Sequence, residues 1–192
     1  QLENLVKVLE GLGVKVDRPE ALEWNQAVVT PHFMTGSMFG CMPPRDVLLT
    51  IGNDIICASM SFRSRFFEHY AYSKLLREYF DKDPNFRWIY SPRPELSDKS
   101  YDMNYFEGDV DEEVLLERTA KLHMVTKEYE ILFDAADVCR LGKDLFIQHG
   151  LTTNRKAMEW IRRMYPDMRV HAVNFPGDPY PIHIDAPFVP LR

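Results

Sequence analysis

Two stretches of this chain repeat one pattern of apolar and polar positions. In the first, residues 45–60 hold two apolar runs on either side of a Gly-Asn-Asp sequence that begins at Gly52, which is typical of a β-hairpin. Apolar residues at helical spacing follow over residues 64–80, and a further strand-like run follows over residues 86–92. The pattern predicts the order strand, strand, helix, strand.

The second stretch predicts the same order in the C-terminal half of the chain. Residues 136–148 form another hairpin candidate around Gly142, residues 154–165 have an apolar helical face, and residues 169–176 are expected to form a strand. Both stretches open with Asp-Val and turn at Gly-Xaa-Asp. A repeated module of this kind predicts an α/β fold with blades arranged about an axis, as in an α/β propeller.

The segments outside these two units are expected to be less regular. Residues 2–12 have the spacing of an amphipathic helix, and residues 11–19 are expected to end it and begin a strand. Residues 17–45 are rich in proline and read as loop. Residues 93–113 are polar and acidic, which predicts a long surface excursion, whereas residues 122–133 are expected to contain one or two strands.

Composition narrows the class of protein. With 192 residues, of which 45% are hydrophobic, the chain is expected to form one globular domain or part of a larger one. Its formal net charge of -6 argues against a nucleic-acid partner. No apolar run reaches the ~20 residues that a membrane span needs. The three cysteines are odd in number and widely spaced, so we expect a cytoplasmic protein, with the mitochondrion as the alternative.

Aspartates stand where the predicted modules begin. Asp46 opens the first hairpin, Asp134 and Asp137 open the second, and Asp185 follows the last strand-like run. Equivalent strand ends gather near the axis of a propeller, so these acids could converge on one cationic ligand. A guanidinium fits, because its planar fork of donors pairs bidentately with carboxylates. The simpler alternative is that each aspartate caps backbone N–H groups at a turn.

A histidine and an aspartate stand two residues apart in the proline-rich C-terminal region. If His183 and Asp185 lie on an extended strand, their side chains point to the same face and form an acid/base pair. A structural role for a lone histidine is the alternative. A metal site would need a second histidine in a matching motif. The other histidines lack one: His32, His69, His123, His149 and His171.

Other conspicuous residues have simpler explanations. The aromatic run from Phe66 to Tyr72 is expected to pack in the core, and the TGSMFG segment lacks a phosphate-binding glycine pattern. Two arginine pairs lie beside acidic residues in predicted helices, so we expect solvated faces for both: Arg63 with Arg65, and Arg162 with Arg163.

At five places the sequence is similar to one enzyme family. The motifs are PRDVLLTIGNDII, RSRFFEHYAY, FDAADVCRLGKDLF, MEWIRRMYPDMRVH and HID. Together they resemble the glycine amidinotransferase family, which includes the arginine:glycine enzyme and relatives that amidinate aminocyclitols and toxin precursors. The resemblance runs from about Asn4 to Asp185. It implies a pentein fold, an α/β propeller of ββαβ modules about a pseudo-fivefold axis, present here only in part.

The resemblance also implies an activity and roles for four residues. Family members move the amidino group of L-arginine to a small acceptor amine and release ornithine, through a covalent cysteine intermediate and without cofactor or metal. By motif, Asp134 and His183 match the catalytic aspartate and histidine. Asp46 and Asp185 match positions that bind the arginine donor. Relatives are often dimers, so a homodimer is expected.

The chain departs from the family at the nucleophile. The family's nucleophilic cysteine follows the HID motif, in blades that residues 1–192 do not include, whereas Cys41, Cys57 and Cys139 stand in other contexts and are expected to be buried structural residues. We therefore expect residues 1–192, which start on glutamine, to be a partial amidinotransferase domain that is inactive alone. A non-catalytic pentein-like binding subunit and an arginine deiminase-type hydrolase are the alternatives.

Overall fold

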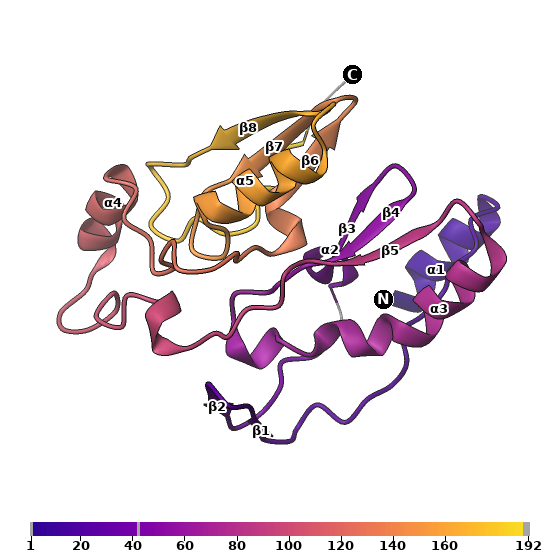
Figure 1. Cartoon of the computed structure of the whole chain (residues 1–192), viewed down its shortest axis with the longest axis horizontal. Coiled ribbons are helices and arrows are strands. Elements are labelled where there is room, and N and C mark those ends of the chain that lie inside the picture. Colours follow the sequence, from indigo (N-terminus) through magenta and orange to yellow (C-terminus); the bar gives the residue numbers. More distant parts are fainter. Residues whose placement is uncertain (1, 42, 190–192) are drawn as a thin grey trace.

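Two three-stranded sheets, each with one helix packed beside it, form the frame of the structure (Figure 1). The computed structural model describes residues 2–41 and 43–189. In the first module the opening hairpin is antiparallel and the third strand returns parallel to the second. The elements of this module are β3 (Leu48–Ile51), β4 (Asp54–Cys57), α3 (Ser73–Lys82) and β5 (Arg87–Tyr90).

The second module repeats this topology. Its first two strands are antiparallel, and its third strand is again parallel to the second. The predicted order strand, strand, helix, strand is therefore confirmed for both stretches. The elements of the second module are β6 (Val138–Leu141), β7 (Asp144–Gln148), α5 (Arg155–Met164) and β8 (Arg169–Val173).

Each module has a Gly-Xaa-Asp turn, and in each the aspartate of the turn forms the same kind of ion pair with an arginine. Gly52 and Gly142 have left-handed φ angles of 60° and 58°, which glycine adopts without steric cost. The aspartate that follows each turn then faces an arginine at the start of the parallel third strand. Asp54 accepts two hydrogen bonds from Arg87, of 2.5 and 2.6 Å, and Asp144 accepts two from Arg169, of 2.7 and 2.5 Å.

One apolar core joins the two modules. Side chains of β3 and β4 pack with side chains of β6, β7 and α5 in a single cluster. Its fully buried members include Val47, Ile56, Phe133, Ile147 and Ile161. The alternation of buried and exposed positions along the strands therefore directs both sheets toward a common interior.

The region before the first module is mostly irregular, as expected, with one error. The predicted strand within residues 11–19 is wrong, because Gly13 turns the chain with a φ of 79° and no strand in the described part of the chain pairs with this segment. The regular elements here are α1 (Leu2–Gly11), β1 (Val28–Val29), β2 (Met34–Thr35) and α2 (Pro44–Val47). Strands β1 and β2 pair with each other.

The helix predicted over residues 64–80 is broken into three parts. Two 3-10 turns, η1 (Arg63–Arg65) and η2 (Glu68–Tyr72), precede α3. Phe66 and Phe67 lie between the two turns, and their rings meet edge to face with centroids 4.8 Å apart. The packing of these aromatic rings therefore accompanies a bend in the chain before α3. Tyr70, which was expected in the core, is about half exposed at 52%.

The segment between the two modules, residues 93–133, is neither a simple surface excursion in its first part nor a pair of strands in its last part. Residues 93–113 are more than a surface excursion, because Leu96 and Tyr105 are buried in two small apolar clusters. Residues 122–133 form no named strand and contribute only an isolated bridge between Thr126 and Tyr101. The elements here are η3 (Asp98–Ser100), α4 (Glu112–Ala120) and η4 (Ala135–Asp137).

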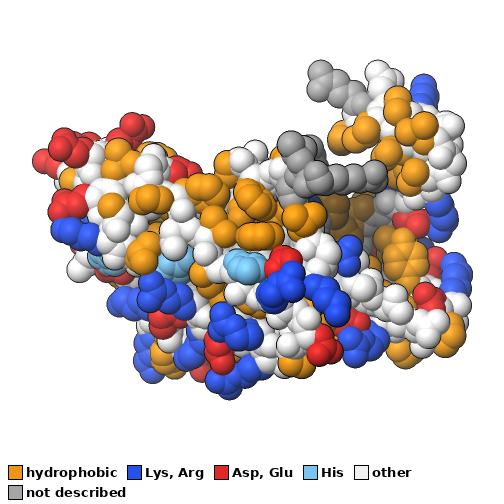
Figure 2. Space-filling view, turned by 90° about the horizontal axis from the view of Figure 1, so that it is seen from above, with side chains coloured by type: hydrophobic (Ala, Val, Ile, Leu, Met, Phe, Trp, Pro, Cys, Tyr) orange, Lys and Arg blue, Asp and Glu red, His pale blue; other side chains and the backbone are white. Residues whose placement is uncertain are grey.

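The surface carries mixed charge and exposed apolar side chains. Figure 2 shows apolar side chains across the middle of the face seen from above, with Lys and Arg interspersed among Asp and Glu below them. None of the helices in the described part of the chain has the length and apolarity needed to cross a bilayer.

We predict that Tyr165→Phe destabilises the protein. The Tyr165 hydroxyl, at the end of α5, donates a 2.5 Å hydrogen bond to the buried Asp54 of the first module. Loss of a hydrogen bond to a charged group costs about 1.5–3 kcal/mol, so urea denaturation should show a lower free energy of unfolding by about that amount. The matched control is Tyr180→Phe, at a half-exposed tyrosine. Equal effects of the two substitutions would contradict this link between modules.

Candidate functional site

The two module starts place Asp46 and Asp134 at one junction. Asp46 lies in the short helix α2 directly before β3, and Asp134 immediately precedes the turn η4, which leads into β6. The turn α2 packs against η4, and Figure 1 shows α2 between the two sheets. Arg45 ties them together, because its guanidinium donates to the carbonyl oxygens of Ala135 and Val138 at 2.9 and 2.5 Å. The segments that lead into β3 and β6 thus each supply one carboxylate to the junction.

His183 reaches the same junction from the C-terminal segment. Its Nε2 lies 3.1 Å from Asp134 Oδ2, and its Nδ1 lies 3.8 Å from Asp46 Oδ2. Its backbone N–H donates to Asp137 Oδ1 at 2.8 Å. The φ angle of His183 is 58°, a left-handed conformation that is uncommon outside glycine and that these contacts hold in place.

The extended arrangement predicted for His183 and Asp185 is wrong. Residues 184–187 form a turn, closed by a 3.1 Å hydrogen bond from Ala186 N–H to the His183 carbonyl. Ile184 is fully buried, and Asp185 Oδ2 lies 3.6 Å from Arg45 Nε. The structure therefore brings Asp46, Asp134 and His183 together. The fourth predicted residue, Asp185, lies at the edge of this group and pairs with Arg45.

Asp137 acts as the support of this segment. Its carboxylate is fully buried and accepts hydrogen bonds from the hydroxyls of Thr152 and Thr153, at 2.5 and 2.6 Å, as well as from the His183 backbone. Burial, followed by the charge of Asp134, raises the pKa of Asp137 to about 7. The sequence singled out this aspartate only as one of the acids at a module start.

The carboxylates raise the pKa of His183 above its ordinary value. Burial alone would lower that pKa, but the hydrogen bond to Asp134 and the charges of Asp134, Asp137 and Asp46 outweigh it. The imidazolium form is therefore favoured at the junction. A histidine in this position can hold a proton at Nε2 beside a buried carboxylate, which suits it to general acid and base chemistry.

Arg65 is the main residue at this junction that its sequence pattern did not place there. We expected it on a solvated face, but its side chain is only 6% exposed and its Nη1 lies 2.9 Å from Asp46 Oδ2 and 3.5 Å from Asp134 Oδ2. The expectation holds for Arg162 and Arg163, which pair with Glu159 at the surface. The available signal was Glu68, three residues after Arg65 among aromatic residues, which favours a buried pair over a solvated one.

The three cysteines do not provide a reactive thiol at this junction. Cys57 is fully buried in β4, and burial raises the pKa of its thiol. Burial followed by the charge of Glu68 also raises the pKa of Cys41. A raised pKa leaves less thiolate at neutral pH. Cys41 and Cys139 are both partly exposed, so the burial predicted for these two is wrong, whereas it is confirmed for Cys57. None of the contacts of His183 or Asp134 within the described residues involves a cysteine.

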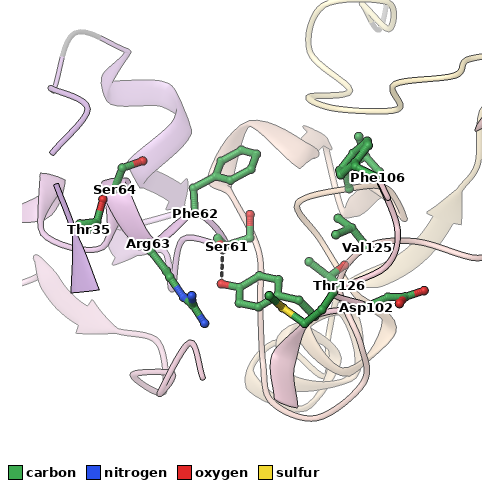
Figure 3. Close-up of a pocket in the computed structure, with 12 residues that line it drawn as sticks. Thr35, Ser61, Phe62, Arg63, Ser64, Asp102, Phe106, Val125 and Thr126 are labelled. Atoms are coloured by element: carbon green, nitrogen blue, oxygen red, sulfur yellow. Dashed lines mark hydrogen bonds between the residues drawn. The ribbon is translucent and has the colours of Figure 1, made fainter. Parts of the chain in front are cut away.

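A groove of about 400 Å³ adjoins the junction through Ser61. The Ser61 backbone N–H donates to Asp134 Oδ1 at 3.2 Å, and its carbonyl accepts a 2.7 Å hydrogen bond from Tyr101 in the groove wall. Figure 3 shows this wall, with Arg63 and Ser61 on one side and Phe106 and Val125 on the other. Among the described residues, no group of three His, Cys, Asp or Glu side chains is arranged to hold a metal ion.

Comparisons with known proteins identify homologues along nearly the whole chain. The chain is 42% identical over 189 residues to the mitochondrial glycine amidinotransferase of Xenopus laevis, covering 98% of this chain and 43% of that protein. It is 41% identical over 192 residues to the L-arginine:L-lysine amidinotransferase of Pseudomonas savastanoi pv. phaseolicola, covering 100% of this chain and 50% of that protein. The chain thus spans about half the length of these relatives. A scan against models of protein families finds no match.

Two solved structures have the same fold over nearly all of this chain. An amidinotransferase of the saxitoxin biosynthetic pathway from Microseira wollei superposes with a TM-score of 0.81 at 36% identity, covering 96% of this chain and 50% of that one. The inosamine-phosphate amidinotransferase of Streptomyces griseus gives a TM-score of 0.80 at 33% identity, covering 100% of this chain and 49% of that one. The predicted partial α/β propeller of the pentein type is confirmed.

We predict that Gly150→Ala displaces His183. A Cβ atom at Gly150 would lie 2.2 Å from the carbonyl oxygen of Pro181, which accepts a hydrogen bond from Leu151 N–H and fixes the segment that carries His183. Such a clash typically costs about 1–3 kcal/mol, and the nuclear magnetic resonance signals of the His183 imidazole should shift. The control is Gly177→Ala, where nothing lies within 4 Å. Unchanged His183 signals in Gly150→Ala would contradict this packing.

We also predict that Asp134→Asn lowers the pKa of His183. In the wild type the carboxylates raise this pKa above 6.5, so the stability that the pair contributes is complete below about 6.5 and is lost as the pH rises through the folded-state value. The substitution removes the strongest raising influence. A magnetic resonance titration of His183 measures the shift, with Asp178→Asn as a control in the same segment. A His183 pKa that does not fall in Asp134→Asn would contradict the assigned ion pair.

Proposed function

We propose, on the premise that this chain is homologous to the glycine amidinotransferases over nearly its whole length, that the protein carrying it is an arginine-dependent amidinotransferase. The protein would move the amidino group of L-arginine to an acceptor amine and release ornithine. The observation that carries the proposal is the meeting of Asp46, Asp134 and His183 at the junction of the two modules. Transfer is favoured over hydrolysis because the homologues are named as amidinotransferases.

The carboxylates have the chemistry to hold the donor. A guanidinium presents parallel N–H donors that match carboxylate oxygens, and two carboxylates from different modules can fix its plane. In this proposal Asp134 and Asp46 orient the guanidinium carbon for attack. Asp185, at the edge of the group and paired with Arg45, would receive the remainder of the arginine molecule.

His183 would move the protons of the reaction. A thiolate forms a bond to the guanidinium carbon, and the bond from that carbon to the ornithine nitrogen breaks while the His183 imidazolium protonates the departing amine. The neutral imidazole then takes a proton from the acceptor amine, which attacks the same carbon and releases the thiolate. The raised pKa of His183, caused by Asp134 and its neighbours against the effect of burial, suits the first of these steps.

The nucleophile and the remaining blades are assigned to parts of the protein outside residues 1–192. In this proposal those residues form a partial amidinotransferase domain, in agreement with its span of about half the relatives' length. The exposed apolar side chains across the face in Figure 2 fit a surface that further blades cover. The chain would then supply the acid/base group and donor carboxylates, while the thiolate arrives from the remaining blades.

The names of the relatives support a class of acceptor and a cellular compartment. Their names include glycine, lysine and inosamine phosphate, so we propose a small amine as the acceptor class. A homodimer stays a prediction. For the compartment, the vertebrate relatives favour the mitochondrion over the cytoplasm that the sparse cysteines led us to expect.

We predict that the full-length protein, incubated with L-arginine and glycine or lysine, releases ornithine and forms the corresponding guanidino compound. His183→Ala should reduce ornithine release by at least about a hundredfold, because general acid catalysis contributes on that scale. Mass spectrometry of both products measures the reaction. His171→Ala, at a histidine on β8 that pairs with Asp144, is the matched control and should keep wild-type activity.

Two outcomes of this experiment would contradict the proposal. Citrulline without ornithine would indicate hydrolysis of the deiminase type. Binding of arginine with neither product, in a full-length protein that has its downstream cysteine, would indicate a non-catalytic binding subunit.

A further inference from the structure

The side chain of Arg65 is enclosed by acids on two sides. On one side its Nη1 lies 2.9 Å from Asp46 Oδ2 and 3.5 Å from Asp134 Oδ2. On the other side Nε donates a 2.9 Å hydrogen bond to Glu68 Oε1, and Nη2 donates a 2.9 Å hydrogen bond to Glu68 Oε2. The Phe39 ring lies over the guanidinium, with its centroid 5.0 Å from Cζ. This is an immobilised guanidinium that contacts both carboxylates proposed to receive the donor.

Glu68 fixes the position of the Arg65 guanidinium. The glutamate is fully buried, and its bidentate pair with Arg65 spans only three residues, between η1 and η2. A buried carboxylate without a partner is costly, so Glu68 and Arg65 stabilise each other's position. Arg65 is therefore built into the frame, unlike a long surface side chain that can swing away.

We propose that Arg65 is a positioning residue of the active site, which holds Asp46 and Asp134 in place to receive the guanidinium of the arginine donor. The inference rests on the proposed function, because it assigns the donor to these carboxylates. Arg65 does not touch the reacting atoms in this account. It acts through the two aspartates, and Glu68 acts through Arg65.

The charges of the site support this role. Asp46, Asp134 and Glu68 carry three negative charges when ionised, and Arg65 supplies one positive charge. The remaining excess of negative charge, to which the nearby Asp137 adds, favours a donor guanidinium and an imidazolium at His183. Without Arg65, the carboxylates at this junction would repel each other and favour protonated forms that bind a cation poorly. The pKa of Glu68 is already raised to about 7, through burial and against the lowering effect of Arg65, with Asp134 and Asp46 raising it further.

A different role for the same side chain makes the opposite prediction. If Arg65 occupied the donor's own place, its removal would open the site and strengthen arginine binding. The bidentate bond to Glu68 and the side-chain exposure of 6% favour a fixed part of the site over a displaceable occupant. The sign of the change in arginine affinity therefore separates the two roles.

Arg63 provides a matched control in the same turn. Its Nε donates to the Leu96 carbonyl at 2.8 Å and its Nη2 lies 2.7 Å from Asp98 Oδ1, so its side chain is directed away from Asp46 and Asp134. Arg63→Lys and Arg65→Lys both keep the positive charge and remove the guanidinium fork. Only the second substitution changes the contacts of the proposed donor site.

The test compares these two variants and Glu68→Gln in the full-length protein. Calorimetric titration with L-arginine measures binding, and ornithine release gives KM and kcat. In Arg65→Lys we expect the Kd and KM for arginine to rise about ten- to a hundredfold, since one ammonium cannot replace a fork that joins three carboxylates. Glu68→Gln, which frees Arg65 without removing it, should raise both values in the same direction. Arg63→Lys should stay within about twofold of the wild type.

The outcomes separate this inference from the proposed function. Arg65→Lys values equal to those of Arg63→Lys would overturn the positioning role, and a lower Kd would show that Arg65 blocks the donor place. A lower kcat with unchanged Kd and KM would also overturn it. If Arg65→Lys fails to fold, Glu68→Gln decides the question by the same measurements. A wild type that binds arginine without releasing ornithine would refute transfer, while the Kd values would still test Arg65.

Discussion

Compensation of buried charge organises the junction between the two modules. Asp134, Asp137 and Glu68 are fully buried, and Asp46 is nearly so, in a small volume that also contains Arg65. Carboxylates so close together are tolerated only if cations and hydrogen-bond donors match them. Arg65 bridges three of the acids, and Thr152 and Thr153 satisfy the fourth. Every other feature of the site is built around this balance, including the position of His183.

The duplicated module explains why the acids meet. In each module a short turn precedes the first strand, and the two turns pack against each other because one apolar core joins the sheets. Asp46 and Asp134 stand at these turns, so a local repeat becomes a pair of converging carboxylates. His183 then arrives on a segment fixed by Asp137 and by the close approach of Pro181 to Gly150. The site therefore depends on contacts between segments far apart in the chain.

The sequence predicted the regular parts of the fold well. The Gly-Xaa-Asp turns and the apolar periodicity located β3, β4, β6, β7 and α5 correctly, because these signals are local. The region from Arg63 to Tyr72 was wrong because aromatic packing breaks the helix there, and residues 122–133 were wrong because apolar side chains pack in clusters without pairing as strands. Local patterns do not report such tertiary packing.

The site was predictable only where its residues stand in local sequence motifs. Asp46, Asp134 and His183 stand in recognisable motifs, whereas the arrangement of His183 and Asp185 depends on a left-handed residue and a turn that the alternating pattern conceals. Arg65 was missed because an arginine among charged neighbours usually faces solvent. Its burial depends on acids that are distant in the sequence, Asp46 and Asp134, as well as on Glu68 nearby.

The most direct test of the account is a crystal structure of the full-length His183→Ala variant with L-arginine bound, because this variant should hold the donor without turnover. The account predicts that the donor guanidinium lies within hydrogen-bonding distance of Asp46 and Asp134 while Arg65 keeps its bidentate contact with Glu68. A donor bound away from these two aspartates, or one that displaces Arg65 from them, would contradict it.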